Sequence, residues 1–399
     1  MKQCVILVGG KGSRLGEITK KFPKPMLEFD SKPFLLHLIN QLKSFGFTKI
    51  VLLAGHAAEV VEEYFKKNKL FGVSIEIIKE KELLGTGGAL INAYDLLEDQ
   101  FFLMNGDSMI DGNWLPINNL LNDENCISMA LVKMSDCSRF GSVVLKDNKV
   151  ISFLEKQNSN SEGLINGGIY CIQKKILRDY KVERLSFEND ILSNFVEKQK
   201  VSGKEINGYF IDIGIPESLE EAKKKKWIAN KKAVVFDRDG TLNYDNGYTH
   251  RVSDLKWKEG AIKLLKFLND SNILVFVATN QAGIAKGIFH ESDMHKFHLE
   301  MQHQLRNIGA HIDGFYFCPY HIDAKVSQYK LDSDDRKPKT GMLKKICEEF
   351  SLEKENMLMI GDRDTDIQCA ENFNISSILY NGIDNLFSLS DNIIKKLRI

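Results

Sequence analysis

The stretch VVFDRDGTLN spans Val234–Asn243 and decides how the second half of the chain folds. An apolar run ends at Phe236, and two carboxylates, Asp237 and Asp239, follow it with one residue between them. Parallel α/β sheets bind their ligands at the carboxyl ends of their strands. A turn placed there can aim both carboxylates at one phosphate, so the stretch predicts a phosphate-handling site in the middle of the chain.

The first sixteen residues, MKQCVILVGGKGSRLG, look like the start of another phosphate site. They place Gly9, Gly10 and Gly12 in a loop after an apolar run, where glycine lets backbone N–H groups approach phosphate oxygens. Arg14 and Lys24 can add cationic donors. The spacing disfavours a P-loop and a nicotinamide-type fingerprint, and such a loop taken alone is also typical of a plain tight turn.

Length and charge limit the class of protein. At 399 residues the chain exceeds the usual size of a single core, so we expect two domains. Its 54 basic and 54 acidic residues balance, which removes the electrostatic case for nucleic acid or a membrane as the main partner. No apolar run approaches the roughly 18 residues that span a bilayer, and no signal-peptide pattern opens the chain. Seven cysteines without a C-x-x-C pair favour a reducing compartment, so we expect a cytoplasmic protein.

Both halves alternate short β-branched runs with amphipathic segments, the pattern of parallel α/β sheets. We therefore expect an α/β protein of two doubly wound domains over 1–225 and 231–399, divided near 222–232. The Lys-rich run Lys223–Lys226 is typical of a solvated helix end between domains, although it could also bind an anion.

The expected elements follow from the same pattern. In the first half, strands are expected over 4–10, 49–55, 73–78, 100–107 and 126–132, and helices over 34–46 and 57–68. In the second half, strands are expected over 233–240, 273–280, 314–319 and 356–364, each ending in polar or charged residues. If these second-half strands are adjacent, their polar ends form one site.

Several first-half motifs occur in a fixed order: GGKGSRLG, FPKPMLEF, LGTGG, NGD, FLEK, INGG and IDIG. This series resembles the sugar-1-phosphate nucleotidyltransferases over about residues 1–222. The resemblance implies a Rossmann-like domain with a mixed sheet, in which a sugar phosphate oxygen attacks the α-phosphorus of a nucleoside triphosphate and pyrophosphate leaves. Because both reactants are anions, such a site must neutralise charge and align them.

The resemblance implies roles for individual residues. Triphosphate binding is implied for Gly9, Gly10, Gly12, Ser13 and Arg14, and Lys24 would act with Arg14 as a catalytic cation. Asp107 and Asp212 would hold Mg²⁺, while Gly85, Thr86 and Gly87 would flank the base and sugar. The sugar phosphate would contact Glu155, Lys156, Asn166 and Gly168. Taken singly, Asp107 is also typical of a turn after a strand, and Asn166-Gly167-Gly168 of a hairpin turn.

In the second half, FDRDGTLN is followed by TNQAGI, RKPKTGM and IGDRDTD, and the series resembles the haloacid-dehalogenase-like phosphatases. The resemblance implies that Asp237 attacks phosphorus, and that Asp239 protonates the leaving oxygen and then activates water. Phosphate would be bound by Thr279, Asn280, Arg336 and the catalytic Lys337. Asp362 would complete a Mg²⁺ site with Asp237 and the backbone carbonyl of Asp239. Asp366 could contribute, or could be a helix N-terminal or solvated residue.

The motifs FDRDGTLNYDNGYTH, TNQAGIAKG, GFYFCPYH and RKPKTGM look like the D-glycero-D-manno-heptose 1,7-bisphosphate phosphatases, with histidinol phosphatase nearby, over about 231–385. That family commonly holds a structural zinc between a Cys-Pro-x-His loop and a later Cys-x-Cys. Here Cys318 and His321 are present, but the later pair is replaced within Ser333, Asp334 and Asp335. Closed structural zinc sites use about four ligands, so we expect no zinc, although one aspartate could substitute.

Three histidines, His295, His298 and His303, fall in the expected helix SDMHKFHLEMQHQL. The first two are one turn apart and could in principle bind a metal. No carboxylate–histidine pattern accompanies them, so a solvated amphipathic helix is the expectation.

Together the two resemblances imply one bifunctional enzyme that uses Mg²⁺ at both sites. It would remove the 7-phosphate of the heptose bisphosphate and then transfer GMP from GTP to heptose 1-phosphate, giving GDP-D-glycero-α-D-manno-heptose. Two alternatives stay open: a mannose- or glucose-1-phosphate nucleotidyltransferase fused to a histidinol- or other sugar-phosphate phosphatase, and a nucleotide-sensing scaffold with one degenerate half. The bases thymidine, cytidine and adenine are not excluded by the residues themselves, and a homo-oligomer is possible.

Overall fold

The computed structural model describes residues 2–10, 22–29, 32–68, 70, 72–80, 82–137, 142–154, 162–214, 218–220 and 231–399. The chain divides into two compact units, Met1–Trp227 and Ile228–Ile399. Among the described residues, no helix combines the length and apolar composition needed to cross a membrane.

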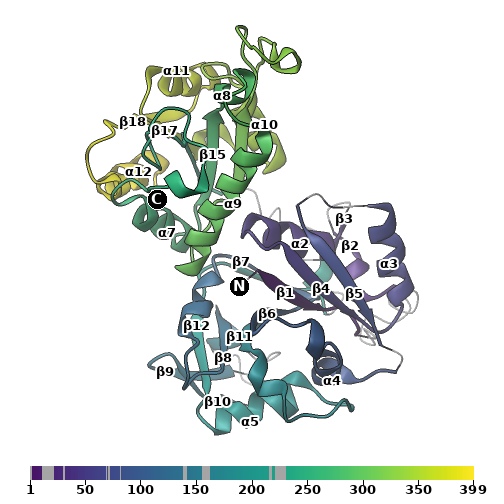
Figure 1. The fold of residues 1–399 in the computed structure, drawn as a ribbon. Coiled ribbons are helices and arrows are strands. Elements are labelled where there is room, and N and C mark those ends of the chain that lie inside the picture. Colours follow the sequence, from purple (N-terminus) through teal and green to yellow (C-terminus); the bar gives the residue numbers. More distant parts are fainter. Residues whose placement is uncertain are drawn as a thin grey trace. The chain divides into compact units, whose positions relative to one another are not determined.

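The first unit is built on a nine-stranded mixed sheet with the strand order β5-β4-β1-β6-β11-β8-β12-β10-β9 (Figure 1). Its strands are β1 (Gln3–Leu7), β4 (Lys49–Ala54), β5 (Ser74–Lys79), β6 (Gln100–Asn105), β8 (Ile127–Met134), β9 (Ser142–Lys146), β10 (Lys149–Leu154), β11 (Gly163–Gln173) and β12 (Val201–Glu205). β1 pairs in parallel with β4 and β6, whereas β11 runs antiparallel to β6 and β8. The mixed sheet and the first-half strands predicted from sequence are therefore confirmed.

Helices cover both faces of this sheet, as a doubly wound fold requires. They are α2 (Phe34–Ser44), α3 (Ala58–Lys67), α4 (Gly85–Asn92) and α5 (Ser193–Glu197). Cys4 and Ile6 of β1 join the core under α2, while Val5 between them joins the core under α4. This alternation follows from the two-residue period of a strand.

Two short antiparallel ribbons complete the first unit. One pairs β2 (Glu28–Phe29) with β3 (Lys32–Pro33), and the other pairs β7 (Ser108–Asp111) with β13 (Tyr209–Asp212). The second ribbon brings two segments about a hundred residues apart in sequence into one register, with Asp212 opposite Ser108.

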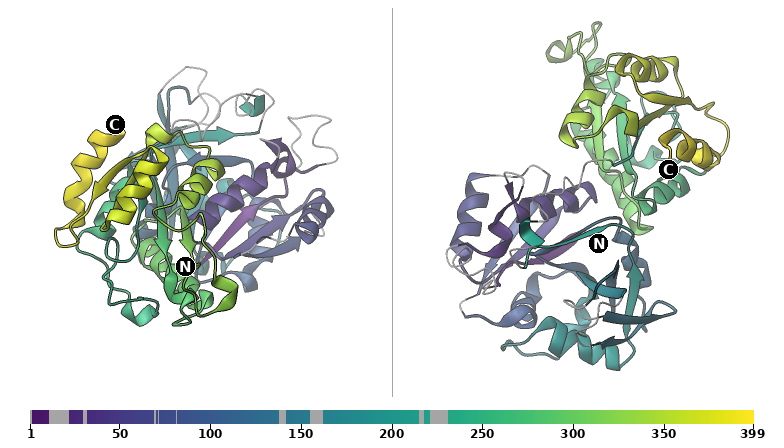
Figure 2. Two further views of the ribbon diagram at one scale, coloured as in Figure 1. Left: turned by 90° about the horizontal axis from the view of Figure 1, so that it is seen from above. Right: turned by 180° about the vertical axis from the view of Figure 1, so that it is seen from behind.

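The second unit, coloured from green to yellow in Figures 1 and 2, has a five-stranded parallel sheet with the order β16-β15-β14-β17-β18. Its strands are β14 (Ala233–Phe236), β15 (Leu274–Asn280), β16 (Gly314–Cys318), β17 (Met357–Gly361) and β18 (Ser376–Leu379). Its helices are α7 (Ala261–Asp270), α8 (Ala282–Ala285), α9 (Glu291–Asn307), α10 (Gly341–Glu349), α11 (Asp364–Phe373) and α12 (Ser390–Leu397). The four strands predicted to end in polar residues are adjacent, so their ends do share one sheet edge.

The strand order explains where a ligand would bind in this unit. β14 is central; the chain adds β15 and β16 on one side of it and β17 and β18 on the other. The helices after β14 and β17 therefore leave toward opposite faces, and core residues of α7 and α9 pack on one face while those of α10 and α11 pack on the other. Parallel sheets bind ligands at such a reversal, which lies between the ends of β14 and β17.

Two details differ from what the sequence suggested: one histidine of the expected solvated helix is buried, and the alternative hairpin interpretation of Asn166-Gly167-Gly168 is wrong. His298 is buried in α9, stacked on Phe315 with ring centroids 4.3 Å apart, because the helical period places it on the same inward face as Met294. Asn166-Gly167-Gly168 is not a hairpin turn: it lies inside β11, where the pairing with β8 shifts register between Asn166 and Tyr170. An irregularity of this kind redirects a strand locally without ending it.

Candidate functional site

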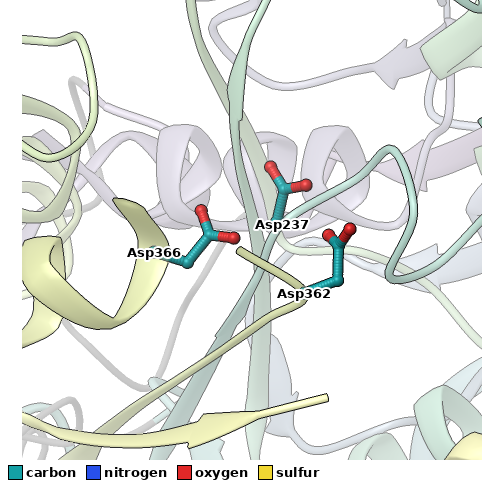
Figure 3. Close-up of side chains that lie close together, drawn as sticks. All are labelled: Asp237, Asp362 and Asp366. Atoms are coloured by element: carbon teal, nitrogen blue, oxygen red, sulfur yellow. The ribbon is translucent and has the colours of Figure 1, made fainter. Parts of the chain in front are cut away.

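Three carboxylates gather at the strand reversal of the second unit. Asp237 follows β14, Asp362 follows β17, and Asp366 lies in the first turn of α11 (Figure 3). One ligand oxygen from each lies within 4.8 Å of the others, which suits a small divalent cation that prefers oxygen ligands. Within the described ranges, this is the one group of three or more His, Cys, Asp or Glu side chains arranged to hold a metal ion.

Lys337 supplies the positive charge inside this acidic group. It is 4% exposed, and its ammonium lies 2.5 Å from Asp237 Oδ1 and 2.7 Å from Asp366 Oδ1. Burial raises the pKa of Asp237 to about 7 even though the attraction of Lys337 lowers it. Burial acts to lower the pKa of Lys337, but attraction to the two carboxylates and its hydrogen bonds to them outweigh burial and raise that pKa. Lys337 is thus held as an ammonium beside the proposed nucleophile.

Asp239 is held by donors on both of its oxygens. Arg238 donates to them through Nε at 3.0 Å and through a terminal nitrogen at 2.7 Å. The side-chain amides of Asn243 and Gln281 add hydrogen bonds of 3.0 and 2.9 Å. Arg238 is itself fully buried, donates to the Thr249 carbonyl oxygen, and stands 3.1 Å from His298 Nε2. Asp239, the carboxylate predicted to transfer the proton, is therefore fixed by hydrogen bonds from Arg238, Asn243 and Gln281, which the sequence did not single out.

The other predicted phosphate ligands have distinct surroundings. Thr279 is buried, and its hydroxyl accepts a hydrogen bond from Gln281. The Asn280 amide is bonded to the backbone of Lys337 on both sides, at 3.0 and 3.1 Å, so it places Lys337 instead of pointing freely at a ligand. Arg336 is half-buried and donates to the Tyr320 carbonyl oxygen at 3.5 Å.

The turn after Asp239 requires glycine. Gly240 has a φ of +94°, and a Cβ there would lie 2.4 Å from Asp362 Oδ2. Thr241 donates to Asp362 Oδ1 at 3.0 Å, which opposes the rise that burial causes in the pKa of Asp362. Gly240 and Thr241 thus allow the turn after Asp239 to pack directly against Asp362 at the end of β17.

The first unit contains a cavity of about 480 Å³ beside the ends of β1 and β6. Its lining includes predicted residues that were far apart in sequence: Gly9, Gly10, Lys24, Gly85, Thr86 and Asp107. Four polar or aromatic residues that the sequence did not single out also line it: Glu80, Arg184, Phe187 and Glu188. The residues Gly12, Ser13, Arg14, Glu155 and Lys156 lie outside the described residues.

Lys24 and Asp107 line this cavity, and a second carboxylate, Asp212, is placed close to Asp107 by strand pairing. Lys24 Nζ is 3.2 Å from Asp107 Oδ2. Asp107 lies in the turn between β6 and β7, and its carbonyl oxygen accepts a hydrogen bond from the Ile213 N–H at 2.9 Å. Since β13 pairs with β7, Asp212 is brought to the same end of the ribbon. Two aspartates so placed fit a Mg²⁺ ion bound jointly by protein and triphosphate.

The LGTGG motif forms the first turn of α4. Gly85 has a φ of +73°, and a Cβ there would lie 2.5 Å from the Leu185 carbonyl oxygen. That oxygen accepts from Gly87 N–H at 2.9 Å, and the Thr86 hydroxyl accepts from Phe187 N–H at 2.8 Å. Gly85 and Gly87 therefore serve close packing of α4 against a later loop, and Thr86 and Phe187 line the cavity together.

Asn166 and Gly168 are not among the residues that line this cavity, but they adjoin two that do, Glu188 and Asn105. The Asn166 amide donates to the Tyr170 hydroxyl at 2.6 Å and to Glu188 at 3.3 Å. Gly168 has a φ of +72°, and its N–H donates to Asn166 Oδ1. The shift of register in β11 thus orients Asn166 toward Glu188 at the cavity wall.

Residues 3–227 match the family model of the nucleotidyl transferases, and residues 335–385 match a HAD-hydrolase-like model. The chain is 37% identical over 216 residues to the D-glycero-α-D-manno-heptose 1-phosphate guanylyltransferase of Campylobacter jejuni, covering 54% of this chain and 96% of the relative. It is 41% identical over 138 residues to the D-glycero-β-D-manno-heptose-1,7-bisphosphate 7-phosphatase of Photorhabdus laumondii, covering 35% of this chain and 73% of the relative. The crystal structure of HddC from Yersinia pseudotuberculosis with GMP-PN is 34% identical, with a TM-score of 0.52 over 56% of this chain and 99% of that one.

Proposed function

The chain belongs to the nucleotidyl transferase family through residues 3–227 and carries a HAD-like phosphatase in its C-terminal unit, and from this premise we propose that it runs two consecutive reactions on one heptose phosphate. The C-terminal unit removes the 7-phosphate of D-glycero-D-manno-heptose 1,7-bisphosphate. The N-terminal unit then transfers GMP from GTP to heptose 1-phosphate, giving GDP-D-glycero-α-D-manno-heptose and pyrophosphate. The observation that carries the proposal is that the two halves resemble enzymes named for a heptose 1,7-bisphosphate and a heptose 1-phosphate.

In the phosphatase reaction, an Asp237 carboxylate oxygen attacks the 7-phosphorus and the bond from phosphorus to the sugar oxygen breaks. Asp239 gives its proton to that oxygen, so the sugar leaves as an alcohol. Asp239 then takes a proton from water, which attacks the aspartyl-phosphate and frees Asp237 and phosphate. Lys337 neutralises charge beside Asp237, where it lies 2.5 Å away. A Mg²⁺ ion held by Asp237 and Asp362 supplies further charge neutralisation when bound.

In the transferase reaction, the 1-phosphate oxygen of the heptose attacks the α-phosphorus of GTP. Lys24 and the backbone N–H groups of Gly9 and Gly10 border the cavity where the triphosphate would lie, and they offset the charge that gathers there. Asp107 and Asp212 are the residues that would hold Mg²⁺ with the triphosphate. A phosphoanhydride bond forms between the heptose 1-phosphate oxygen and the α-phosphorus, the bond from the α-phosphorus to the β-phosphate breaks, and pyrophosphate leaves.

Glu80 is the residue that favours guanine over the other bases. It is half-buried in the cavity wall beside Gly9 and Gly55, burial raises its pKa, and its Oε2 accepts the Leu84 N–H at 3.3 Å. Guanine alone among the common bases presents two adjacent donors, N1–H and the 2-amino group, on its pairing edge. A single carboxylate accepts such a pair in bidentate fashion.

The two relatives differ in the anomer that their names specify, α for the transferase and β for the phosphatase. The phosphatase chemistry occurs at C7 and breaks no bond at C1, so the anomer that enters the first reaction is the one delivered to the second. We therefore propose the α-bisphosphate as the substrate of the full sequence.

Separate variants test whether the sites are two. Asp237→Asn should abolish phosphate release while nucleotidyl transfer from supplied heptose 1-phosphate stays within about twofold of the unmodified chain, and Asp107→Asn should do the reverse. Joint loss of both activities in either variant, with circular dichroism unchanged, would contradict independent sites.

Glu80→Gln should lower kcat/KM for GTP by about 100-fold or more while the values for ATP and UTP change little, because a carboxylate built to accept two donors discriminates strongly. Equal loss for all three nucleotides would refute the role of Glu80.

A further inference from the structure

The loop over 319–336 leaves the sheet after Cys318 and returns at Arg336 and Lys337, next to the phosphatase site. Its first and last parts meet: Arg336 donates to the Tyr320 carbonyl oxygen, and His321 N–H donates to the Tyr329 carbonyl oxygen at 3.1 Å. The position of Arg336 therefore depends on how this loop is held. In the related phosphatases that the sequence resembles, a zinc ion commonly does this.

The residues here do not fit zinc. The Cys318 thiol is hydrogen-bonded to the Ser333 hydroxyl and lies 3.8 Å from the Tyr320 carbonyl oxygen, and burial raises its pKa, which disfavours the thiolate that zinc needs. His321 Nδ1 accepts the Asp323 N–H at 3.0 Å. Cys318, His321, Asp334 and Asp335 do not converge as a donor group among the described residues. Asp334 and Asp335, which could have replaced a cysteine ligand, instead form ion pairs with lysines.

Three carboxylates in residues 332–335 of this loop form ion pairs with lysines that lie outside it. Lys345, on α10, lies 2.5 Å from Asp335 Oδ2, and the Asp335 side chain is only 18% exposed. Lys339 lies 2.8 Å from Asp332 Oδ1 and 3.8 Å from Asp334 Oδ1. Between these carboxylates, Ser333 is buried at 7% exposure and its hydroxyl accepts the Asp335 N–H at 3.2 Å.

We propose that Lys339 and Lys345 are positioning residues of the phosphatase, which fix the 319–336 loop through Asp332, Asp334 and Asp335 where related enzymes use zinc. The two lysines tie the returning end of the loop to α10 and to the segment just before it: Lys345 lies in the middle of α10, and Lys339 precedes that helix. The Cys318–Ser333 hydrogen bond joins the two ends of the loop. Arg336 is the next residue after Asp335, so an ordered Asp335 sets the direction in which the guanidinium leaves the backbone. The inference rests on the proposed phosphatase activity for its kinetic consequence alone.

The kinetic consequence is specific. If the loop opens in a fraction of molecules, only the closed fraction binds substrate, and the apparent KM rises as that fraction falls. At saturating substrate the loop is drawn closed again, so kcat is conserved. A purely structural defect would instead reduce the amount of active enzyme and lower apparent kcat at unchanged KM.

The experiment compares Lys345→Met and Lys339→Met with Lys344→Met as the matched control, in the full chain with saturating Mg²⁺. Lys344 lies on the same helix, is 67% exposed and pairs at 3.9 Å with Glu348, away from the loop. We expect KM for the bisphosphate to rise by up to about 5-fold in Lys345→Met, which loses the pair with the largely buried Asp335, and by less in Lys339→Met, whose partners Asp332 and Asp334 are exposed; kcat should be unchanged in both. Hydrogen exchange of peptides over 319–336 should speed up in both, and the control should match the unmodified protein in both measurements.

A zinc site built into the same place gives the complementary test. Ser333→Cys with Asp335→Cys removes the Lys345 ion pair and adds two thiols to Cys318 and His321. Without zinc this variant should show the raised KM, and with one bound zinc per chain it should regain the original KM and slow exchange. Stoichiometric zinc in the unmodified protein, or variants of Lys339 and Lys345 that exchange like Lys344→Met, would overturn the proposal. Since metal content and hydrogen exchange need no turnover, failure of the phosphatase assignment is distinguishable from failure of this one.

Discussion

Replacing Lys337 by methionine should destabilise the C-terminal unit strongly. Lys337 is 4% exposed, and its ammonium lies within 2.7 Å of both Asp237 and Asp366; methionine matches its length without its charge. Removing one partner of a buried pair leaves an uncompensated buried charge and costs about 3–5 kcal/mol. A domain of this size loses about 2–4 °C of melting temperature per kcal/mol, so the transition of this unit should fall by roughly 6–20 °C.

The loss should be confined to one half of the chain. Hydrogen exchange of the full-length variant should speed up over 231–399 and stay unchanged in the first unit, and phosphate release should disappear while nucleotidyl transfer remains. Adding Asp366→Asn to Lys337→Met should recover part of the stability, since one of the two stranded carboxylates is removed, but it should not recover phosphate release. Lys344→Met serves as the surface control, with an expected change within about 0.5 kcal/mol.

A Lys337→Met protein with the original melting transition would refute the reasoning, because it would show that the buried carboxylates need no counterion. Phosphate release at the original rate would also refute it. Recovery of both stability and activity by Asp366→Asn would mean that Lys337 offsets charge but takes no part in the reaction.

Three further predictions follow from other contacts. Asp107→Asn should reduce nucleotidyl transfer by about 100-fold or more at saturating Mg²⁺, with the residual rate rising as Mg²⁺ is increased; insensitivity to Mg²⁺ would contradict a ligand role. Gly168→Ala should destabilise the first unit by about 1–3 kcal/mol in denaturant unfolding, because a Cβ there would lie 2.7 Å from Ser108 Oγ. Gly72→Ala should cost less, since Gly72 shares the positive φ but has open space around it. Equal costs for the two variants would refute the contribution of the clash with Ser108. Burial, and then the charge of Arg238, lower the pKa of His298. Below pH about 6.5 the unfolded state therefore binds more protons than the folded state, and the free energy of unfolding falls by up to about 1.4 kcal/mol per pH unit. His298→Gln should remove this part of the pH dependence between pH 7.5 and 5, and an unchanged slope would contradict the prediction.

The elements that sequence predicted well are those set by local pattern. Val234 and Phe236 face one core and Ala233 and Val235 the other, so the run before Asp237 reads as a fully buried strand from its own residues. Because all five strands of that unit are parallel, the polar residues predicted at the strand ends lie together at one edge of the sheet.

What sequence missed depends on contacts between distant segments. Arg238 stands between two aspartates with no local pattern that marks it as buried, yet it is buried against His298, sixty positions later. Asp366 lies at the helix N-terminus, as one of its two interpretations predicted: its carboxylate accepts the Arg363 N–H at the start of α11, and it also pairs with the distant Lys337. Glu80 became a site residue only when the end of β5 was placed beside Gly9 by strand pairing.

One chain is expected to dephosphorylate a heptose bisphosphate and then to activate the product as a nucleotide sugar. The most direct test supplies D-glycero-α-D-manno-heptose 1,7-bisphosphate, GTP and Mg²⁺ to the full chain and follows the products by mass spectrometry. The account predicts GDP-heptose, with one phosphate and one pyrophosphate released per molecule and heptose 1-phosphate as the transient species. Accumulation of GDP-heptose that still carries its 7-phosphate, or release of phosphate with no nucleotide sugar under any of the four common nucleoside triphosphates, would contradict it.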